Sequence, residues 1–183
     1  MKRDWIILDR DGVINQDSDA YIKSLEEWHP LPGSIEAMAR LSRAGYRLAV
    51  ITNQSGLARG LFDHATLEAM HRRLAELLQV EGGRIDALYF CPHGPDDACD
   101  CRKPRPGMVL RLAEEHDVDL SRTWALGDSL RDLQAAEAAG ARPALVFTGK
   151  GARTLATHPE LPRRFPVFPD LAAFVDLLLE NHG

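Results

Sequence analysis

The stretch Leu8-Asp9-Arg10-Asp11-Gly12-Val13 joins a predicted buried strand to a pair of carboxylates. The apolar run 5–8 predicts the strand, and Gly12 permits the backbone to turn sharply after it. In an open α/β sheet, ligand sites lie in the crevice beyond the carboxyl ends of the strands. We therefore expect Asp9 and Asp11 to face one cleft, where two carboxylates suit Mg²⁺ and can act as nucleophile and acid/base.

An ordinary polar turn after a strand explains the same residues equally well when they are taken alone, because short motifs also arise by chance. Three later stretches bear on this choice. Each of them follows a further predicted strand, and each contains residues that bind phosphate or metal.

The composition favours a globular chain with a small-molecule partner. The 183 residues fit one domain, 1–183, and 45% of them are hydrophobic against 27% charged. The formal net charge of -5 disfavours a nucleic-acid partner, which usually requires a basic stripe. It is compatible with a phosphorylated substrate, because a bound metal and a few local cations supply the positive field.

Targeting and redox signals point to the cytoplasm. The N-terminal residues lack the apolar segment of a signal peptide, and no apolar run has membrane-spanning length. We therefore expect a cytoplasmic protein without a membrane partner. Cys91, Cys99 and Cys101 fall within eleven residues, which in a reducing compartment indicates a metal site and not a disulfide framework.

Alternating strand and helix patterns predict the fold class. Predicted strands cover 5–8, 46–51, 85–90, 123–126 and 143–147, and predicted helices cover 34–45, 63–80, 108–116, 130–140 and 171–179. This alternation predicts an α/β fold with a doubly wound parallel sheet. We expect residues 152–169 to be irregular and the last helix to cover the sheet edge.

The segment 15–32 is too long for a simple connection between a strand and a helix. We expect it to form a flap over the cleft, and a short β-hairpin packed on the side is the alternative. It contains Asp17, Asp19 and Tyr21.

The second chemical stretch is Thr52-Asn53-Gln54-Ser55, directly after the strand 46–51. Hydroxyl and amide donors at a strand's carboxyl end are suited to bind phosphate oxygens. Turn residues have a similar composition, so this stretch carries weight only together with the others.

A complete zinc-ligand set follows the third predicted strand. Cys91, His93, Cys99 and Cys101 supply three thiols and one imidazole, the donors of a tetrahedral Zn²⁺ site. With all four positions filled by protein, the ion is expected to be structural and to stiffen the loop 91–105. Free or buried cysteines beside an incidental histidine are the alternative.

His64 and His71 are expected to be surface or rim residues of the helix 63–80, because no second ligand has suitable spacing.

Two further groups complete the predicted site. Arg102 and Lys103 come directly after the last cysteine, and both are suited to phosphate, Arg as a bidentate donor and Lys as a point charge. Asp128 follows the strand 123–126 and can join Asp9 on the cation. Asp132 lies one helical turn further on, where it can support that site.

These motifs resemble those of the haloacid dehalogenase-like (HAD) phosphatases over residues 5–150. The match rests on Asp9-x-Asp11-Gly12, Thr52, Lys103 and Gly127-Asp128, in the same order and at strand ends. LDRDGVIN, TNQSGLARG, CPHGPDDACDCRKPRPGM and GDSLRDLQAA are similar to the D-glycero-D-manno-heptose 1,7-bisphosphate 7-phosphatases. The zinc-bearing phosphatase domain of histidinol-phosphate phosphatase shares nearly all of these features. The resemblance implies a Rossmann-like HAD fold without a large cap domain.

The resemblance also implies a role for each motif residue. Asp9 would attack phosphorus and form an aspartyl-phosphate, while Asp11 would protonate the leaving oxygen and then activate water. Mg²⁺ would be held by the Asp9 side chain, the Asp11 backbone carbonyl and Asp128. Thr52 and Lys103 would bind the transferring phosphoryl group. The positions that match the family's substrate contacts are Asp17, Tyr21, Asn53, Gln54, Ser55 and Arg102.

The chain departs from the family pattern in three places. Ser129 stands where some members carry a lysine that contacts substrate. The flap is one residue longer than in some members, and the zinc loop is shorter than in several. Recognition of the distal part of the substrate is therefore open at this point.

The leading hypothesis from the resemblance is a Mg²⁺-dependent phosphatase that removes the C7 phosphate of heptose 1,7-bisphosphate in lipopolysaccharide precursor synthesis. It would act as a monomer on a small sugar phosphate. The alternative is histidinol-phosphate phosphatase in histidine synthesis, because Asp17 and Asp19 could bind a cationic amine. A 3′-phosphatase on nucleic-acid ends is disfavoured by the acidic charge, and a zinc-stabilised binding module without turnover is the non-enzymatic hypothesis.

Overall fold

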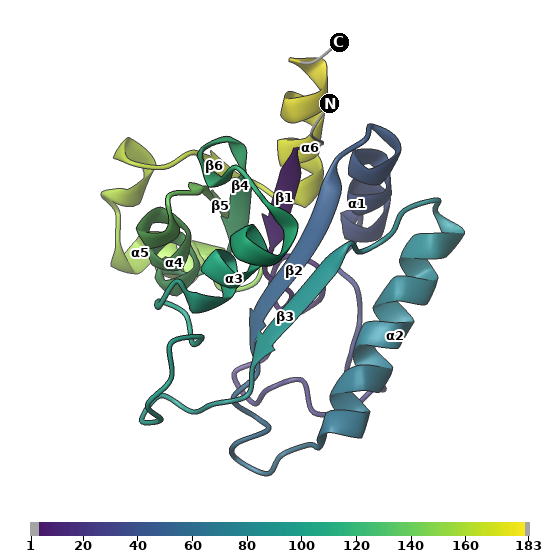
Figure 1. The fold of residues 1–183 in the computed structure, drawn as a ribbon, viewed down its shortest axis with the longest axis vertical. Helices are drawn as coiled ribbons and strands as arrows, with labels where there is room; N and C mark the ends of the chain where they lie inside the picture. The colour runs from purple at the N-terminus through teal and green to yellow at the C-terminus, as the bar shows by residue number, and fades with distance from the viewer. Residues whose placement is uncertain (1–3, 182–183) are drawn as a thin grey trace.

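A parallel sheet forms the centre of the computed structural model, which describes residues 4–181 (Figure 1). Its strands are β1 (Trp5–Leu8), β2 (Arg47–Asn53), β3 (Ala87–Cys91), β4 (Trp124–Gly127), β5 (Arg142–Val146) and β6 (Val167–Phe168). They are ordered β3-β2-β1-β4-β5-β6, and every neighbouring pair is parallel. The predicted doubly wound α/β sheet is confirmed.

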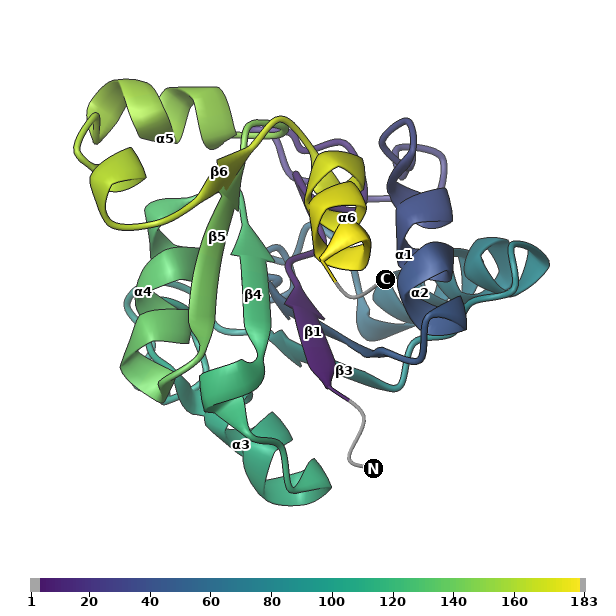
Figure 2. The ribbon, with the colours of Figure 1, turned by 90° about the horizontal axis from the view of Figure 1, so that it is seen from above.

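Helices cover both faces of the sheet. They are α1 (Ser34–Arg43), α2 (His64–Val80), α3 (Gly107–His116), α4 (Leu130–Ala139), α5 (Gly151–Thr157) and α6 (Leu171–Glu180). Figure 2 shows α1, α2 and α6 on one side of β1 and β4, with α3 and α4 on the other. The helix α2 is held by Met70, Leu74 and Leu78, whose spacing of four residues forms one buried stripe.

Two sequence predictions about the C-terminal part are wrong. Residues 152–169 are not irregular, because α5, a 3₁₀ turn (Leu161–Arg163) and β6 lie there. A seven-residue helix and a two-residue strand are too short to display a readable period. The last helix does not cover the sheet edge, which is formed by β6. The helix α6 packs beside α1 on a face of the sheet, because Phe174 and Val175 join the core there.

The strand order places a crevice above the centre of the sheet. The chain moves outward in one direction from β1 to β2 and in the other direction from β4 to β5. At such a switch point the loops after β1 and β4 diverge to opposite sides and leave room for a ligand. The residues that follow β1, β2 and β4 therefore meet above this crevice.

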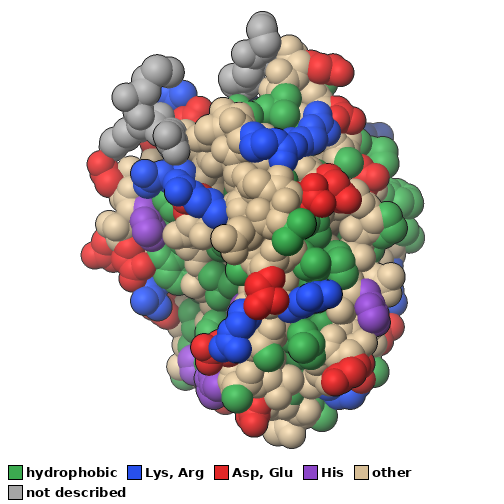
Figure 3. Space-filling model, turned by 90° about the vertical axis from the view of Figure 1, so that its right-hand side faces the viewer, with side chains coloured by type: hydrophobic (Ala, Val, Ile, Leu, Met, Phe, Trp, Pro, Cys, Tyr) green, Lys and Arg blue, Asp and Glu red, His purple; other side chains and the backbone are tan. Residues whose placement is uncertain are grey.

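The surface provides two further facts. On the face seen in Figure 3, acidic and basic side chains are interspersed, with hydrophobic side chains between them. Within residues 4–181, no helix combines the length and the apolar character needed to cross a membrane.

Candidate active site

A cavity of about 310 Å³ lies beyond the carboxyl ends of β1, β2 and β4. Its walls bring together all the residues that the sequence analysis assigned to catalysis, Mg²⁺ or substrate: Asp9, Asp11, Asp17, Tyr21, Thr52, Asn53, Gln54, Ser55, Arg102, Lys103 and Asp128. Parallel strands end at the same edge of their sheet, which explains why motifs far apart in sequence meet here.

A buried lysine connects two carboxylates at the floor of the cavity. Lys103 Nζ lies 3.0 Å from Asp9 Oδ1 and 2.7 Å from Asp132 Oδ1, and it also donates to the Ile51 carbonyl oxygen at 2.9 Å. Burial disfavours the charge of Lys103, but Asp132 and Asp9 outweigh it and raise the pKa of the ammonium. Lys103 therefore stays protonated and fixes the orientation of Asp9.

Three carboxylates crowd beside this lysine. Oxygens of Asp9, Asp128 and Asp132 lie within 4.8 Å of one another. Burial, followed by repulsion from Asp132, raises the pKa of Asp9 to about 7 and that of Asp128 to about 9. A divalent cation would remove this repulsion, and oxygen ligands at this spacing suit Mg²⁺. Asp9 and Asp128 thus fit the predicted magnesium site.

Glycine permits the close approach of these groups. Gly12 has φ +88°, and a Cβ there would overlap the Asp128 carboxylate. A Cβ on Gly127 would overlap the Asp132 side chain. Asp128 is further fixed by the Lys150 backbone N–H, which donates to its Oδ2 at 2.8 Å.

Arg10, which the sequence analysis passed over, holds the second aspartate. Its side chain is fully buried, and its Nε and Nη2 donate to Asp11 Oδ1 at 2.9 and 2.8 Å. Asn15 donates to the same oxygen at 2.9 Å, and Gln54 donates to Oδ2 at 3.2 Å. Burial opposes ionisation, but Arg10 and these amides lower the pKa of Asp11. The free protein therefore presents Asp11 as a carboxylate.

His71 stands behind Arg10. Its Nε2 lies 3.2 Å from Arg10 Nη1, and because a guanidinium only donates, His71 must accept and be neutral. Burial, together with the charge of Arg10, lowers the pKa of His71 to about 3. His64 is exposed, as predicted. His71 is instead half-buried and supports the residue that holds Asp11.

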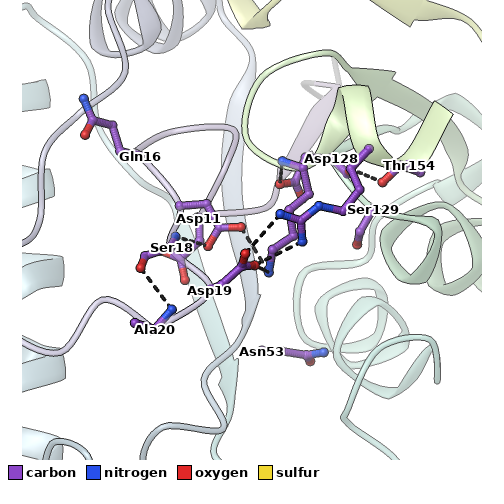
Figure 4. A network of polar contacts seen from close by, with 12 residues as sticks. Asp11, Gln16, Ser18, Asp19, Ala20, Asn53, Asp128, Ser129 and Thr154 are labelled. Atoms are coloured by element: carbon purple, nitrogen blue, oxygen red, sulfur yellow. Dashed lines mark hydrogen bonds and ion pairs between the residues drawn. The ribbon is translucent and has the colours of Figure 1, made fainter. Parts of the chain in front are cut away.

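Ion pairs tie the flap to the start of α5. Lys150 Nζ lies 3.3 Å from Asp17 and 3.9 Å from Asp19, and both terminal nitrogens of Arg153 lie 3.1 Å from Asp19. Figure 4 shows Asp19 extending from the flap toward these cations. The segment pairs with itself through one isolated antiparallel bridge between Asn15 and Pro30, and within residues 15–32 no strand pair forms the alternative hairpin.

The cysteine loop brings its four predicted ligands together. Cys91 Sγ lies 3.0 Å from Cys101 Sγ and 3.9 Å from Cys99 Sγ. His93 Nδ1 lies 3.5 Å from Cys91 Sγ and 3.4 Å from Cys101 Sγ. Ligands of a tetrahedral zinc ion are separated by about 3.5–3.8 Å, given Zn–S and Zn–N bonds of about 2.3 and 2.0 Å. The donor set fits zinc, and three of the four separations lie close to these values, while that between Cys91 Sγ and Cys101 Sγ is shorter.

Comparisons with known proteins agree with this geometry. Two family models match, one described as HAD-hydrolase-like over residues 100–174 and one as polynucleotide kinase 3 phosphatase over residues 6–132. The D-glycero-beta-D-manno-heptose-1,7-bisphosphate 7-phosphatase of Pseudomonas aeruginosa is 58% identical over 98% of this chain and 100% of the relative. The chain belongs to this family of HAD-like phosphatases.

Solved structures of family members support the assignment. The crystal structure of D,D-heptose 1,7-bisphosphate phosphatase from B. bronchiseptica, complexed with magnesium and phosphate, has a TM-score of 0.94 and 56% identity, and the match covers 97% of this chain and 99% of that one. The corresponding phosphatase from Burkholderia thailandensis has a TM-score of 0.76 and 47% identity over the same shares. The chain is thus an enzyme of the phosphoric monoester hydrolase class with a Rossmann-like HAD fold.

One family position has its side chain engaged within the protein. Asn53 Nδ2 donates to the Lys103 carbonyl oxygen at 3.1 Å, and Asn53 Oδ1 accepts from the Lys103 backbone N–H at 3.0 Å. Both ends of its amide therefore hold the Lys103 backbone against β2. Asn53 lines the cavity where the sequence placed it, and these contacts make it also a clamp between two phosphatase motifs.

Proposed function

We propose that this chain removes the C7 phosphate of D-glycero-β-D-manno-heptose 1,7-bisphosphate during synthesis of the heptose precursor of lipopolysaccharide. The observation that supports this proposal most strongly is the position of the nearly buried Asp9, whose Oδ1 lies 3.0 Å from Lys103 Nζ and whose carboxylate stands beside that of Asp128. This arrangement occurs in a chain that matches relatives of that name almost from end to end.

The chemistry follows from the positions of the two aspartates after β1. Asp9 attacks phosphorus, so that an Asp9–phosphorus bond forms while the bond from phosphorus to the sugar oxygen breaks. Asp11 gives a proton to that oxygen. It then takes a proton from the water that attacks the aspartyl-phosphate and releases inorganic phosphate. Asp11 is ionised in the free protein, and the negative charge of the bound phosphate favours its protonation.

Charge neutralisation supplies most of the remaining catalysis. The Thr52 hydroxyl and the Lys103 ammonium would contact the phosphoryl oxygens from the floor of the cavity. Bound Mg²⁺, held by Asp9 and Asp128 with the Asp11 backbone carbonyl, would offset the charge that develops on the phosphoryl group. Gln54 and Ser55 lie on the wall beside Thr52, where they can orient the sugar.

The cysteine loop is proposed to hold a structural Zn²⁺ through Cys91, His93, Cys99 and Cys101. Arg102 and Lys103 continue directly from its last ligand. A rigid loop would therefore hold both cations at the cavity, and this is the contribution we assign to the zinc.

We also propose that residues 1–183 form one phosphatase domain with a flap near 15–32 and a zinc loop at 91–105, acting as a cytoplasmic monomer. The cavity is built from one chain, and the formal net charge of -5 disfavours a nucleic-acid partner. Neither a membrane nor a second subunit is needed to complete the site.

Histidinol phosphate is the less favoured substrate. This alternative required Asp17 and Asp19 to bind the cationic amine of the substrate. In the structure, Lys150 pairs with Asp17 and Arg153 pairs with Asp19. The test is kcat/KM for each substrate, measured side by side with Mg²⁺. We expect the heptose bisphosphate to be preferred at least tenfold, and a preference for histidinol phosphate would contradict the proposal.

A further inference from the structure

The cavity contains three positive charges that lack a negative partner. Of its five Lys and Arg side chains, Lys103 pairs with Asp9 and Asp132, and Lys150 pairs with Asp17 and Asp19. The remaining three are Arg59, Arg102 and Arg131. Within residues 4–181, no carboxylate lies within ion-pair distance of any of them.

Within the described residues, eight arginines pair with a carboxylate, and six outside this cavity do not, but none of those six lines a shared cavity with another in this way. Arg40 pairs with Asp176 at 2.6 Å, Arg111 with Glu115 at 2.7 Å, and Arg164 with Glu137 at 2.9 Å. The proposed phosphoryl-transfer step assigns no role to Arg59 or Arg131, and it does not say which part of the substrate Arg102 contacts. Their gathering at one opening therefore requires a separate explanation.

Three different segments deliver these arginines. Arg59 comes from the loop after β2, and its guanidinium lies 5.5 Å from the ring centroid of the flap residue Tyr21. Arg102 comes from the end of the cysteine loop, where its Nη1 donates to the His93 carbonyl oxygen at 3.2 Å. Arg131 lies in the first turn of α4. All three side chains line the same cavity.

The cavity is thus polarised from floor to mouth. Asp128 is buried and Asp9 is nearly so at the floor, where the metal would bind. Arg59 and Arg131 are exposed at the mouth. A ligand that spans this distance would place one anionic group on the metal and the lysine, and a second anionic group on the arginines.

We propose that Arg59 and Arg131 join Arg102 in a binding site for the second phosphate of the bisphosphate substrate, the one that is not hydrolysed. This inference rests on the proposed function and deepens it. Guanidinium groups bind phosphate oxygens in pairs of parallel hydrogen bonds, and a dianion would relieve the repulsion among three unpaired cations.

The site also accounts for the departure at Ser129. Its hydroxyl donates to Asp132 Oδ2 at 2.9 Å and is therefore used within the cap of α4. Arg131 lies two residues further along the same turn and lines the cavity, so it can supply the cation that Ser129 lacks. A substrate with a cationic distal group would be repelled by the same three residues.

The test compares heptose 1,7-bisphosphate with heptose 7-phosphate, which lacks the second phosphate. Both are assayed with Mg²⁺ on the wild type, Arg59→Gln, Arg131→Gln and the double variant. We expect the double variant to lose on the order of tenfold or more in kcat/KM on the bisphosphate, mainly through KM, and clearly less on the monophosphate. Arg131→Lys should retain part of the preference, because it keeps the charge without the fork.

Arg73→Gln is the matched control, since Arg73 is exposed on α2 and lies outside the cavity. It should leave both substrates unaffected. A double variant that keeps the wild-type preference for the bisphosphate, or that loses equally on both substrates, would overturn the arginine site alone. A wild type that prefers histidinol phosphate would overturn the proposed function itself, so the two failures are distinguishable.

Discussion

Lys103 Nζ lies 3.0 Å from Asp9 Oδ1, although the two residues are 94 positions apart, about half of the chain. The cysteine loop brings Lys103 to the end of β1, and Asn53 clamps its backbone there. Asp132 holds the other side of the ammonium at 2.7 Å. The nucleophile that we propose is therefore oriented by three separate segments of the chain before any substrate arrives.

Asp9→Asn should abolish turnover and leave the fold intact. The amide keeps the shape of the side chain but cannot attack phosphorus, so kcat should fall on the order of 10³-fold or more. Because Asp9 is repelled by Asp132, the metal-free variant should melt no lower than the metal-free wild type. Steady-state assays and thermal melts measure both effects. Asp176→Asn, on the exposed face of α6, is the matched control and should keep full activity.

The sequence indicates which residues gather in the cavity wherever a strand end fixes the position of a side chain. Asp9, Thr52 and Asp128 each occur at the carboxyl end of an apolar run, and a parallel sheet brings such ends together. The four zinc-ligand candidates cluster in sequence, so the loop that joins them cannot separate them far. For these residues, the positions along the chain are enough to predict which side chains lie close together.

Other residues depend on packing that spacing does not encode. Arg10 sits between two aspartates in a turn, and nothing in the sequence indicates that its side chain enters the core and meets His71, 61 positions away. Asp132 was expected as a support of the metal site, and in the structure it is also the counterion of Lys103. The strand β6 was missed because two residues display no period.

His71→Leu should destabilise the protein by about 1–3 kcal/mol, because buried Arg10 Nη1 would lose its nitrogen acceptor and keep only the weak acceptor Met70 Sδ at 3.6 Å. His71→Gln keeps an acceptor and should cost less. Chemical denaturation at pH 7.5 measures the free energy of unfolding. The exposed His64→Gln is the control and should change it by less than about 0.5 kcal/mol. Equal stability of His71→Leu and the wild type would refute the supporting role.

The pH dependence of His71 offers a second readout. Its pKa is lowered to about 3 in the folded protein, against about 6.5 in the unfolded chain. The unfolded chain therefore binds more protons below pH 6.5, and His71 costs stability as the pH falls. The stability of the wild type relative to His71→Gln should accordingly decline from pH 7.5 to pH 5. A constant difference across that range would contradict the neutral histidine.

Magnesium should stabilise the protein more strongly at high pH. The folded pKa values of Asp9 and Asp128 are about 7 and about 9, above their unfolded values of about 3.9. The metal-free folded protein therefore binds more protons in this range and loses stability as the pH rises. Mg²⁺ binds only the ionised carboxylates, so the rise in the Tm of the protein on adding Mg²⁺ should be larger at pH 8.5 than at pH 6. The melts should be made on protein loaded with zinc. A Mg²⁺-induced rise in Tm that becomes smaller with rising pH would contradict Asp9 and Asp128 as the ligands.

Loss of zinc should loosen the loop that carries the cations. Cys99→Ser removes one of the four ligands and should lower the zinc content of the purified protein. Hydrogen exchange should quicken over residues 91–101, and KM should rise because Arg102 and Lys103 follow directly. Mass spectrometry measures the hydrogen exchange and steady-state assays measure KM. In wild-type protein treated with a chelator, added Zn²⁺ should restore the original exchange rates and KM. A zinc-free loop with unchanged exchange and KM would rule out the structural role.

The most direct test of the account is a ³¹P NMR time course on heptose 1,7-bisphosphate with Mg²⁺. The account predicts that the C7 phosphate resonance disappears, that inorganic phosphate appears in equal amount, and that the phosphate at C1 persists. Asp9→Asn should leave the spectrum unchanged. Loss of the C1 phosphate first, or an inert bisphosphate with a wild type that consumes histidinol phosphate, would contradict the central claim.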